Sequence, residues 1–335
     1  MHVILMLTHF TMLRPVSSVI TRYSTTCTSS FHPNTSTSSS FNLITPSRTI
    51  TSPTNPLPKH ILKLQSNPKY VKESMETVLE GIKNVSDLWQ RSESCIFTSL
   101  LVTEKGLGLL NSRLNDSDYS SPSHYPSCET VLINDAVANK ISSVNTNQGV
   151  FLILKIPPYI EQSHSNDNEF YLILDGVSDP GNVGTLIRSH LAFAPTTTKP
   201  KIIMFGSGCA NPFGPAVLRS SAGASFLCEH KTIPDLEGLR EFFRDVRGKG
   251  KIFVASMAED GAENNFEEAD FKNACGLVLG NEGAGVCESL RLAAACSEEE
   301  LFEQISVEMS GKVESLNVAV VGSIILNKMG KYIPN

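Results

Sequence analysis

Acidic residues are missing from the start of the sequence: no aspartate or glutamate precedes Glu73, although the 335-residue chain contains 34 of them. Residues 1–56 instead hold 23 serines and threonines, three arginines and no lysine. Low acidity, scattered arginine and many hydroxyl side chains are typical of an organellar transit peptide, whereas a secretory signal needs a clean apolar core. We therefore predict that residues 1–56 form a transit peptide or disordered leader. The serine and threonine excess favours the chloroplast over the mitochondrion.

Long apolar runs and paired cysteines are missing as well. No window approaches about 18 consecutive apolar residues, so the sequence predicts no membrane span. None of the eight cysteines forms a Cys-x-x-Cys pair, and no histidine lies at metal-ligand spacing from them. We therefore predict no metal site and reduced thiols in a reducing compartment.

The body of the chain has no excess of positive charge. Without the three leader arginines, 25 of the 28 basic residues remain against 34 acidic ones, a net charge of -9. A general nucleic-acid binder presents a basic field to the phosphates. Any nucleic-acid binding by this chain would therefore need a local patch, a surface made by a dimer, or a helper protein.

Hydrophobic periodicity predicts a small first domain over residues 57–157. Apolar residues at three- and four-residue steps predict a helix over 60–90, and a second helix is expected over 135–143. Strands are predicted over 97–103 and 150–156, and the serine- and proline-rich segment 111–130 is predicted to be a loop. Residues 158–168 are polar and are interpreted as a linker.

Residues 169–335 show short apolar strands alternating with helical patterns, which indicates a parallel sheet covered by helices on both faces. In such sheets ligands bind outside the carboxyl ends of the strands. The predicted strands are 170–174, 201–205, 252–256 and 276–279, with shorter candidates at 224–228 and 305–309. The predicted helices are 183–194, 215–222, 234–246, 286–296 and 315–331.

Three loops at strand ends carry unusual residues. The first, 175–184, contains Gly181 and Gly184 before a helix that could hold an anion, but it lacks both the G-x-G-x-x-G spacing and the lysine of a P-loop. The second, 277–286, places three glycines around Glu282. The third, 307–317, leads into an apolar helix for which Ser315 is the predicted N-cap.

Taken together, the three loops resemble a known family. The segments DGVSDPGNVGTLIRS, LVLGNEGAGV and EMSGKVESLNVAV are similar to the three signature motifs of the SpoU (TrmH) family of RNA ribose methyltransferases, in the family's order. NPFGPAVLRSSAGASF resembles a further family segment between the first two. The resemblance covers residues 169–331, and extends more faintly to 58–157, which look like the family's small L30e-like substrate-binding domain.

The resemblance implies a SPOUT-type α/β fold, with a trefoil-knotted parallel sheet preceded by the L30e-like domain. It implies a homodimer that binds S-adenosylmethionine and methylates a ribose 2′-hydroxyl in ribosomal or transfer RNA, without a metal. The residues that fall on the family's catalytic and substrate-positioning residues are Asn182, Arg188, Glu282, Ser315 and Asn317. Those whose main chain would hold the cofactor are Leu279, Gly280, Val307, Met309 and Leu316.

Several residues depart from the family pattern. Glu308 stands where proline is usual and would add charge near the cofactor, and Ser297 to Glu300 look like a short acidic insertion. Gly214 and Ala216 replace residues that could contact RNA. These departures leave a catalytically silent RNA-binding or ribosome-assembly factor as the alternative. A nucleotide-dependent oxidoreductase is a more distant one, because the glycine spacing it needs is missing.

Overall fold

The computed structural model describes residues 44–91, 95–115, 128–158, 170–194, 199–246, 250–256, 265–296, 300–310, 312–313 and 315–332. Most of the predicted leader and nearly all of the predicted linker lie outside these ranges. The predicted leader nevertheless ends too late. Residues Arg48–Ile50 form strand β1, which pairs with β4 and buries Ile50, so they belong to the folded part of the chain.

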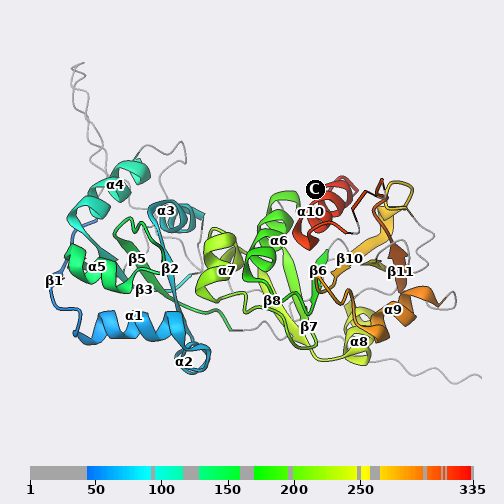
Figure 1. The fold of residues 1–335 in the computed structure, drawn as a ribbon, viewed down its shortest axis with the longest axis horizontal. Coiled ribbons are helices and arrows are strands. Elements are labelled where there is room, and N and C mark those ends of the chain that lie inside the picture. The colour runs from blue at the N-terminus through cyan, green and yellow to red at the C-terminus, as the bar shows by residue number, and fades with distance from the viewer. Residues whose placement is uncertain are drawn as a thin grey trace, which may run out of the picture. The chain divides into compact units, whose positions relative to one another are not determined.

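The N-terminal half, residues 44–158, contains a mixed five-stranded sheet of order β1-β4-β3-β5-β2 (Figure 1). Strands β1 and β3 run parallel to β4, whereas β5 runs antiparallel to β3 and β2. The strands are β1 (Arg48–Ile50), β2 (Glu76–Glu80), β3 (Phe97–Val102), β4 (Glu129–Ile133) and β5 (Val150–Lys155). The helices are α1 (Pro56–Ser66), α2 (Pro68–Ser74), α3 (Ile82–Arg91), α4 (Glu104–Asn115) and α5 (Asp135–Ile141).

The single helix predicted over 60–90 is wrong, because the segment holds three helices and a strand. Asn67 caps α2 through a hydrogen bond from the backbone N–H of Tyr70, and Pro68 opens that helix. Met75 then takes a left-handed conformation with φ 51° and turns the chain into β2. The apolar steps that suggested one helix are shared between elements that pack on the same core. The predicted loop over 111–130 likewise overlaps α4 and β4 at its ends, and residues 116–127 lie outside the described ranges.

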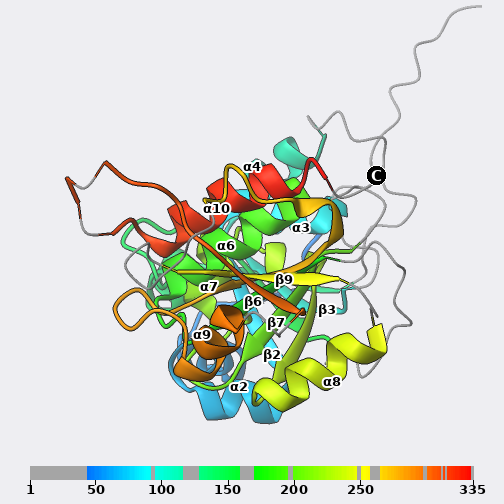
Figure 2. The same ribbon diagram turned by 90° about the vertical axis from the view of Figure 1, so that its right-hand side faces the viewer.

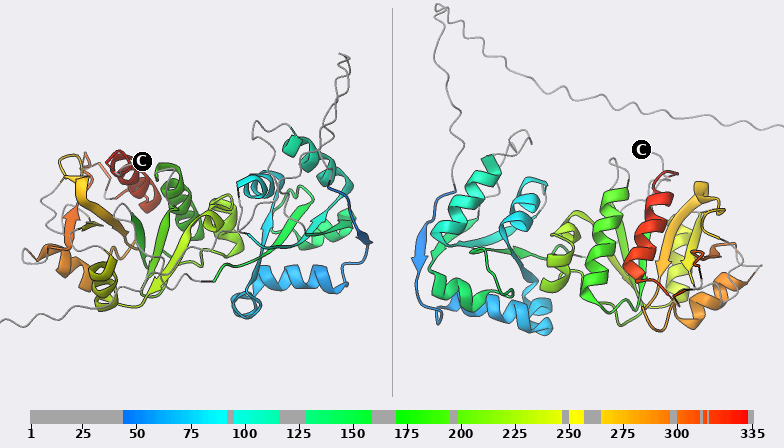
Figure 3. Two further views of the ribbon diagram at one scale, coloured as in Figure 1. Left: turned by 180° about the vertical axis from the view of Figure 1, so that it is seen from behind. Right: turned by 45° about the horizontal axis from the view of Figure 1, so that its top comes forward.

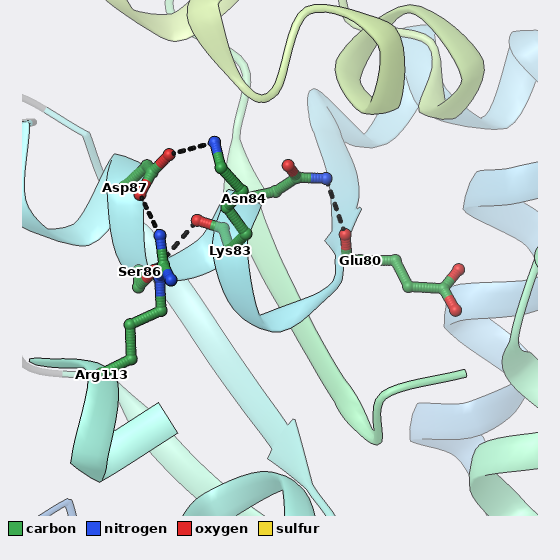
Figure 4. Close-up of polar contacts among 6 residues, drawn as sticks. All are labelled: Glu80, Lys83, Asn84, Ser86, Asp87 and Arg113. Carbon is green, nitrogen blue, oxygen red and sulfur yellow. Dashed lines mark hydrogen bonds and ion pairs between the residues drawn. The ribbon is translucent and has the colours of Figure 1, made fainter. Parts of the chain in front are cut away.

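Polar contacts attach α3 to its neighbours (Figure 4). Lys83 Nζ lies 3.0 Å from a carboxylate oxygen of Asp87, and Arg113 of α4 donates to Ser86 Oγ at 2.8 Å and to Asp87 at 3.4 Å. Asn84 Nδ2 donates to the carbonyl of Glu80 at 3.1 Å, just before α3 begins. Both cations of this group are therefore already paired with protein acceptors.

The C-terminal half, residues 170–332, contains a six-stranded sheet of order β11-β9-β10-β6-β7-β8, in which every pair is parallel. The strands are β6 (Tyr171–Asp175), β7 (Lys201–Phe205), β8 (Glu229–Ile233), β9 (Lys251–Ala255), β10 (Ala274–Leu279) and β11 (Phe302–Ile305). The helices are α6 (Pro180–Phe193), α7 (Pro215–Ser220), α8 (Leu236–Val246), α9 (Glu288–Ala295) and α10 (Val318–Met329).

The prediction of a parallel sheet with helices on both faces is confirmed. Leu172, Leu174 and Leu277 pack on one face with α6, α7 and α10, while Tyr171 and Ile173 pack on the other with α8 and α9. Figure 2 shows the two helical layers on either side of the strands. The strand predicted over 224–228 is a 3-10 helix, Ala224–Leu227, and β8 follows it. The trefoil knot and the L30e-like class of the N-terminal half stay predictions.

Helices α6 and α10 lie side by side over this sheet (Figure 3), and glycine makes the approach possible. A Cβ at Gly322 of α10 would lie 2.4 Å from Leu186 of α6 and 2.5 Å from Leu279 of β10. At the next residue of α10, Ser323 Oγ shares a hydrogen bond of 2.7 Å with Ser189 Oγ of α6. The contact brings the beginning of α10 next to the loops that precede α6 and follow β10.

The two halves meet in one hydrophobic cluster. Phe213, Leu218 and Phe226 belong to the core of the N-terminal half rather than to that of the parallel sheet. Thr77 Oγ1 of β2 donates to the carbonyl of Phe213 at 2.7 Å in a buried position. The segment around α7 therefore connects both sheets, although periodicity assigned it to the second domain alone.

Candidate active site

The first of the three loops follows β6 and is fixed at both of its ends. Buried Asp175 accepts a 2.6 Å hydrogen bond from the backbone N–H of Cys287, the residue that directly follows the second loop. Gly176 adopts φ 67°, a conformation that favours glycine. Asp179 then caps α6 by accepting from the backbone N–H of Asn182 at 2.8 Å. The loop therefore presents Asn182 in the first turn of a capped helix.

The second loop follows β10 and closes on itself. Asn281 and Gly285 exchange backbone hydrogen bonds of 2.8 and 2.9 Å. The side chain of Asn281 accepts from the N–H groups of Gly283 and Ala284, and its Nδ2 donates to the carbonyl of Gly176 at 2.9 Å. Asn281 thus connects the second loop to the first. Asn281 was not among the residues predicted from the sequence, where the glycines and Glu282 were the residues singled out in this loop.

Gly280 is required by the shape of this turn. A Cβ at Gly280 would lie 2.3 Å from both the carbonyl carbon of Gly285 and the backbone nitrogen of Val286. Gly283 differs, since its Cβ would meet only Asn281 Oδ1, at 3.7 Å. Of the two glycines, only Gly280 is therefore required by the close packing of backbone on backbone.

A chain of side chains joins all three loops. Asn317 Nδ2 donates to Asn182 Oδ1 at 2.9 Å, and Asn182 Nδ2 donates to Glu282 Oε1 at 2.6 Å. Asn317 Oδ1 also accepts from the N–H groups of Ala319 and Val320, so Asn317 is the N-cap of α10. The prediction that Ser315 caps this helix is wrong, because α10 begins at Val318 and Ser315 lies two residues before the N-cap position.

A cavity of about 240 Å³ opens where the second and third loops meet the ends of β9 and β10. Its apolar wall consists of Ala255, Leu279, Val286, Val307, Met309, Leu316, Val318 and Val321. Its polar groups are Ser256, Asn281, Glu282, Arg291 and Ser315, with Gly280, Gly283, Ala284 and Gly285 between them. The five residues predicted to hold a cofactor, Leu279, Gly280, Val307, Met309 and Leu316, all line it.

Three of the predicted catalytic residues are not part of the cavity wall. Asn182 and Asn317 are linked to it through Glu282, but Arg188 stands apart. Arg188 is exposed on α6, and within the described residues its guanidinium has no hydrogen-bond or ion-pair partner. An α-helix turns about 100° per residue, so the six residues from Asn182 to Arg188 place the two side chains on different faces. The structure therefore brings Asn182, Glu282 and Asn317 together and leaves Arg188 facing solvent.

Besides Asn281, two polar groups of the cavity were not predicted from the sequence. Ser256 follows β9 directly, and its buried hydroxyl has no hydrogen-bond partner among the described residues. Arg291 lies on α9, one turn after the N-cap Cys287. The position of Ser256 at the carboxyl end of a strand was the available signal, since ligands bind at that edge. Nothing in the spacing of Arg291 pointed to the cavity.

Glu308 does not add its charge to the cavity, contrary to the expectation from sequence. Val307 and Met309 line the cavity, whereas the carboxylate of Glu308, between them, accepts a 3.0 Å hydrogen bond from Asn265 Nδ2 outside it. Neighbouring residues of an extended chain point in opposite directions, which explains the alternation. The predicted acidic insertion lies mostly outside the described ranges.

Titratable groups near the loops are held in their neutral forms. Burial raises the pKa of the Cys209 thiol, whose Sγ donates to the carbonyl of Leu174 at 3.1 Å. Burial lowers the pKa of both His190 and His230 to about 4, and neither ring lines the cavity. Of the described residues, no group of three or more histidine, cysteine, aspartate or glutamate side chains is placed to hold a metal ion. None of the described helices is long and apolar enough to span a membrane.

Comparisons with known proteins agree on the C-terminal half. Residues 169–327 match the SpoU rRNA Methylase family. An uncharacterized tRNA/rRNA methyltransferase of Synechocystis is 29% identical over 60% of this chain and 66% of that protein. A 23S rRNA (guanosine-2′-O)-methyltransferase of Bacillus subtilis is 31% identical over 46% of this chain and 55% of that protein. The chain thus spans between about half and two thirds of the length of these curated relatives.

Solved structures share the fold over a larger part of the chain. An AdoMet-bound rRNA methyltransferase of Sinorhizobium meliloti has a TM-score of 0.66 at 23% identity, covering 86% of this chain and 98% of that one. A protein of the TrmH family from Porphyromonas gingivalis has a TM-score of 0.62 at 25% identity, covering 81% and 96%. Residues 169–327 of this chain thus form a domain that matches the SpoU rRNA Methylase family.

Proposed function

We propose that this protein transfers a methyl group from S-adenosylmethionine to a ribose 2′-hydroxyl of ribosomal or transfer RNA. The observation that carries the proposal is the hydrogen-bonded chain Asn317–Asn182–Glu282, which joins three loops beside a cavity at the carboxyl edge of a parallel sheet. The names of the relatives, which are ribose and rRNA methyltransferases, support the same chemistry.

The residues of the cavity fit S-adenosylmethionine. The apolar side chains of Leu279, Val307 and Met309 offer a wall for a nucleoside, and the orphaned hydroxyl of Ser256 offers a hydrogen bond to a polar ligand. A volume of about 240 Å³ is below the roughly 300–1,000 Å³ of ligand pockets that enclose their ligands fully. We infer that part of the cofactor extends past the exposed rim at Glu282 and Ser315. When bound, this cofactor supplies a methyl group already activated by its sulfonium.

The residues of the chain then have to align the ribose hydroxyl and assist its loss of a proton. Alignment alone can lower the barrier by several kcal/mol. Arg188 is too basic to accept a proton, so its role is to orient the hydroxyl and stabilise developing negative charge. Its solvent-facing position on α6 suits a nucleophile delivered by a macromolecule from outside the cavity. Glu282 and Asn317 hold the amide of Asn182 in one orientation, which makes Asn182 a fixed hydrogen-bonding group for the ribose.

RNA must be held without a broad basic surface. Residues 57–335 have a net charge of -9, and the cations Lys83 and Arg113 of the N-terminal half are paired with Asp87 (Figure 4). Arg188 is an exception, because its guanidinium has no partner among the described residues. We infer that a second protein copy or a helper protein completes the RNA-binding surface.

We also propose a homodimer. Leu316, Val320 and Ile324 are 41%, 48% and 40% exposed, and their four-residue spacing places them on one side of α10 and the residue before its cap. An apolar stripe of this kind is typical of a surface that another protein covers. Sedimentation equilibrium tests it: Val320→Glu should shift the protein from dimer to monomer, and a monomeric wild type would contradict the proposal.

An organellar location, with the chloroplast favoured, completes the proposal and rests on residues 1–56 alone. The residues before β1, 1–47, fused to a fluorescent protein should direct it to the organelle. Fluorescence spread through the cytosol would contradict this part.

The central experiment is a thermal-shift titration of the full chain with S-adenosylhomocysteine, with NAD(P) as the comparison ligand. Ligands that bind only the folded state raise its melting temperature. Stabilisation by S-adenosylhomocysteine and not by NAD(P) is expected, and the reverse would sink the proposal. Methyl transfer to organellar ribosomal and transfer RNA then separates an enzyme from a silent RNA-binding factor.

Arg188→Ala should lower kcat about 1,000-fold, the order expected when a group that stabilises transition-state charge is removed. The affinity for S-adenosylhomocysteine should stay within about twofold, because Arg188 does not line the cavity. Single-turnover kinetics and calorimetry measure the two effects. Turnover at the wild-type rate would show that Arg188 is not catalytic.

A further inference from the structure

Arg291 has a placement that differs from that of the other arginines described. It is partly buried, it lines the cofactor cavity, and within the described part of the chain its guanidinium has no hydrogen-bond or ion-pair partner. By contrast, Arg48, Arg113 and Arg219 donate to Glu129, Ser86 and Ser143, respectively. Arg188 also lacks a described partner, but it is exposed and outside the cavity.

A guanidinium in this position calls for an acceptor. A charge that is partly removed from water is costly unless it is paired. The guanidinium group offers five N–H donors in a planar fork, which matches the two oxygens of a carboxylate. Among the described residues, the one acid that lines the cavity is Glu282, which already accepts from Asn182 at 2.6 Å. The acceptor for Arg291 is therefore expected to come from the ligand.

We propose that Arg291 binds the carboxylate of the amino-acid part of S-adenosylmethionine, and thereby distinguishes the intact cofactor from nucleosides that lack this group. The inference rests on the proposed function, because it takes the cavity to be the cofactor site. Charge complementarity supports it. The described residues of the cavity wall include one cationic and one anionic side chain, Arg291 and Glu282, and the amino-acid part of the ligand has one carboxylate and one ammonium group.

The test compares two ligands that differ in the amino-acid part. S-adenosylhomocysteine has the carboxylate, whereas 5′-methylthioadenosine keeps the adenosine and the sulfur and lacks it. Isothermal titration calorimetry on the full chain gives both dissociation constants. In Arg291→Gln, the affinity for S-adenosylhomocysteine should fall by more than about tenfold, as expected for the loss of a charge-assisted bidentate pair. The affinity for 5′-methylthioadenosine should stay within about twofold.

Two further variants complete the design. Arg291→Lys keeps the charge but loses the planar fork, so it should recover part of the lost affinity. Arg244→Gln is the matched control, because Arg244 lies on α8 with its side chain 67% exposed and does not line the cavity. It should bind both ligands like the wild type.

Each outcome has a defined meaning. Equal losses for both ligands in Arg291→Gln, or no loss for either, would overturn the assignment of Arg291 while leaving the cofactor site in place. Unchanged affinity for S-adenosylhomocysteine with weaker RNA binding would show that Arg291 contacts an RNA phosphate instead, and would also overturn it. If the wild type binds neither ligand, the proposed function and the inference fail together.

Discussion

The two sheets of this protein place their loops differently. In the N-terminal sheet, β5 runs opposite to the other four strands, so the loop after β5 lies at the other edge from the loops after β1 to β4. In the C-terminal sheet every neighbouring pair is parallel, so the loops after β6, β10 and β11 all lie at one edge. At that edge, Asn182, Glu282 and Asn317 come into contact although up to 135 positions separate them in the chain.

The C-terminal sheet shows how parallel strand direction gathers functional residues. Parallel strands must return along a crossover, usually a helix, and each return brings another loop to the same edge. Polar side chains of the N-terminal half pair locally instead, as Lys83, Asp87 and Arg113 do in Figure 4. Each of the following substitutions changes one of the two halves of the protein, and the measurement shows whether the other half is affected.

The largest effect is expected from Gly280→Ala, in the loop edge of the parallel sheet. The added Cβ would overlap the backbone at Gly285 and Val286, so the loop must open. Affinity for S-adenosylhomocysteine should fall by about 100-fold or more, in line with the roughly 3 kcal/mol of a severe steric change. Gly283→Ala, with its Cβ no closer than 3.7 Å to another group, is the control and should bind normally. Normal binding by both variants would show that the loop does not shape the site.

The next effect concerns the buried histidines of the C-terminal half. His190 donates to the carbonyl of Lys201, and burial lowers its pKa from 6.5 to about 4. Since the unfolded chain then binds a proton more readily than the folded one, stability is complete above about pH 6.5 and is lost as the pH falls towards 4. The loss should approach about 3 kcal/mol per buried histidine.

Urea unfolding of the wild type and of His190→Gln at a series of pH values checks this. The variant keeps a side-chain donor but cannot titrate, so its stability should decline less across the same pH range. Equal declines in both proteins would contradict the lowered pKa of His190.

A smaller effect is expected at Asn317, which has two roles. Asn317→Ala removes the N-cap of α10 and should lower the free energy of unfolding by about 1 kcal/mol. Asn317→Asp keeps an oxygen acceptor for the cap but loses the donor to Asn182. We expect Asn317→Asp to be nearly as stable as the wild type. Its kcat should be reduced about tenfold, because no side-chain amide at position 317 then orients Asn182. Equal kcat values for the wild type and Asn317→Asp would show that the orientation of Asn182 by Asn317 does not affect catalysis.

The smallest effect is expected in the N-terminal half. Gly108 lies in α4, and a Cβ there would meet nothing within 4 Å. Gly108→Ala should raise the free energy of unfolding by roughly 0.5–1 kcal/mol and leave cofactor affinity unchanged. Gly106→Ala in the same helix should destabilise instead, because its Cβ would lie 2.4 Å from the carbonyl oxygen of Gly149. Altered cofactor affinity in Gly108→Ala would mean that the two halves are coupled.

Sequence patterning was more successful for the parallel sheet than for the mixed one. Buried parallel strands are continuous apolar runs separated by helices, so β7 was predicted at its observed bounds and β6, β9 and β10 within two residues. In the N-terminal half, β2 lies between helices whose apolar residues continue its spacing, and periodicity merged them into one helix. β1 was missed because three residues in a polar, serine-rich segment give no pattern.

The sequence by itself determined the parallel α/β architecture, the three loops and, through family resemblance, the residues that line the cavity. Those features depend on local composition and on spacing along the chain. Only the tertiary structure decided that Asn281 holds two loops together, that Asn317 rather than Ser315 caps α10, and that Glu308 points away from the cavity. It also placed Ser256 and Arg291 at the cavity. These depend on side-chain direction and on contacts between distant segments, which a one-dimensional pattern does not contain.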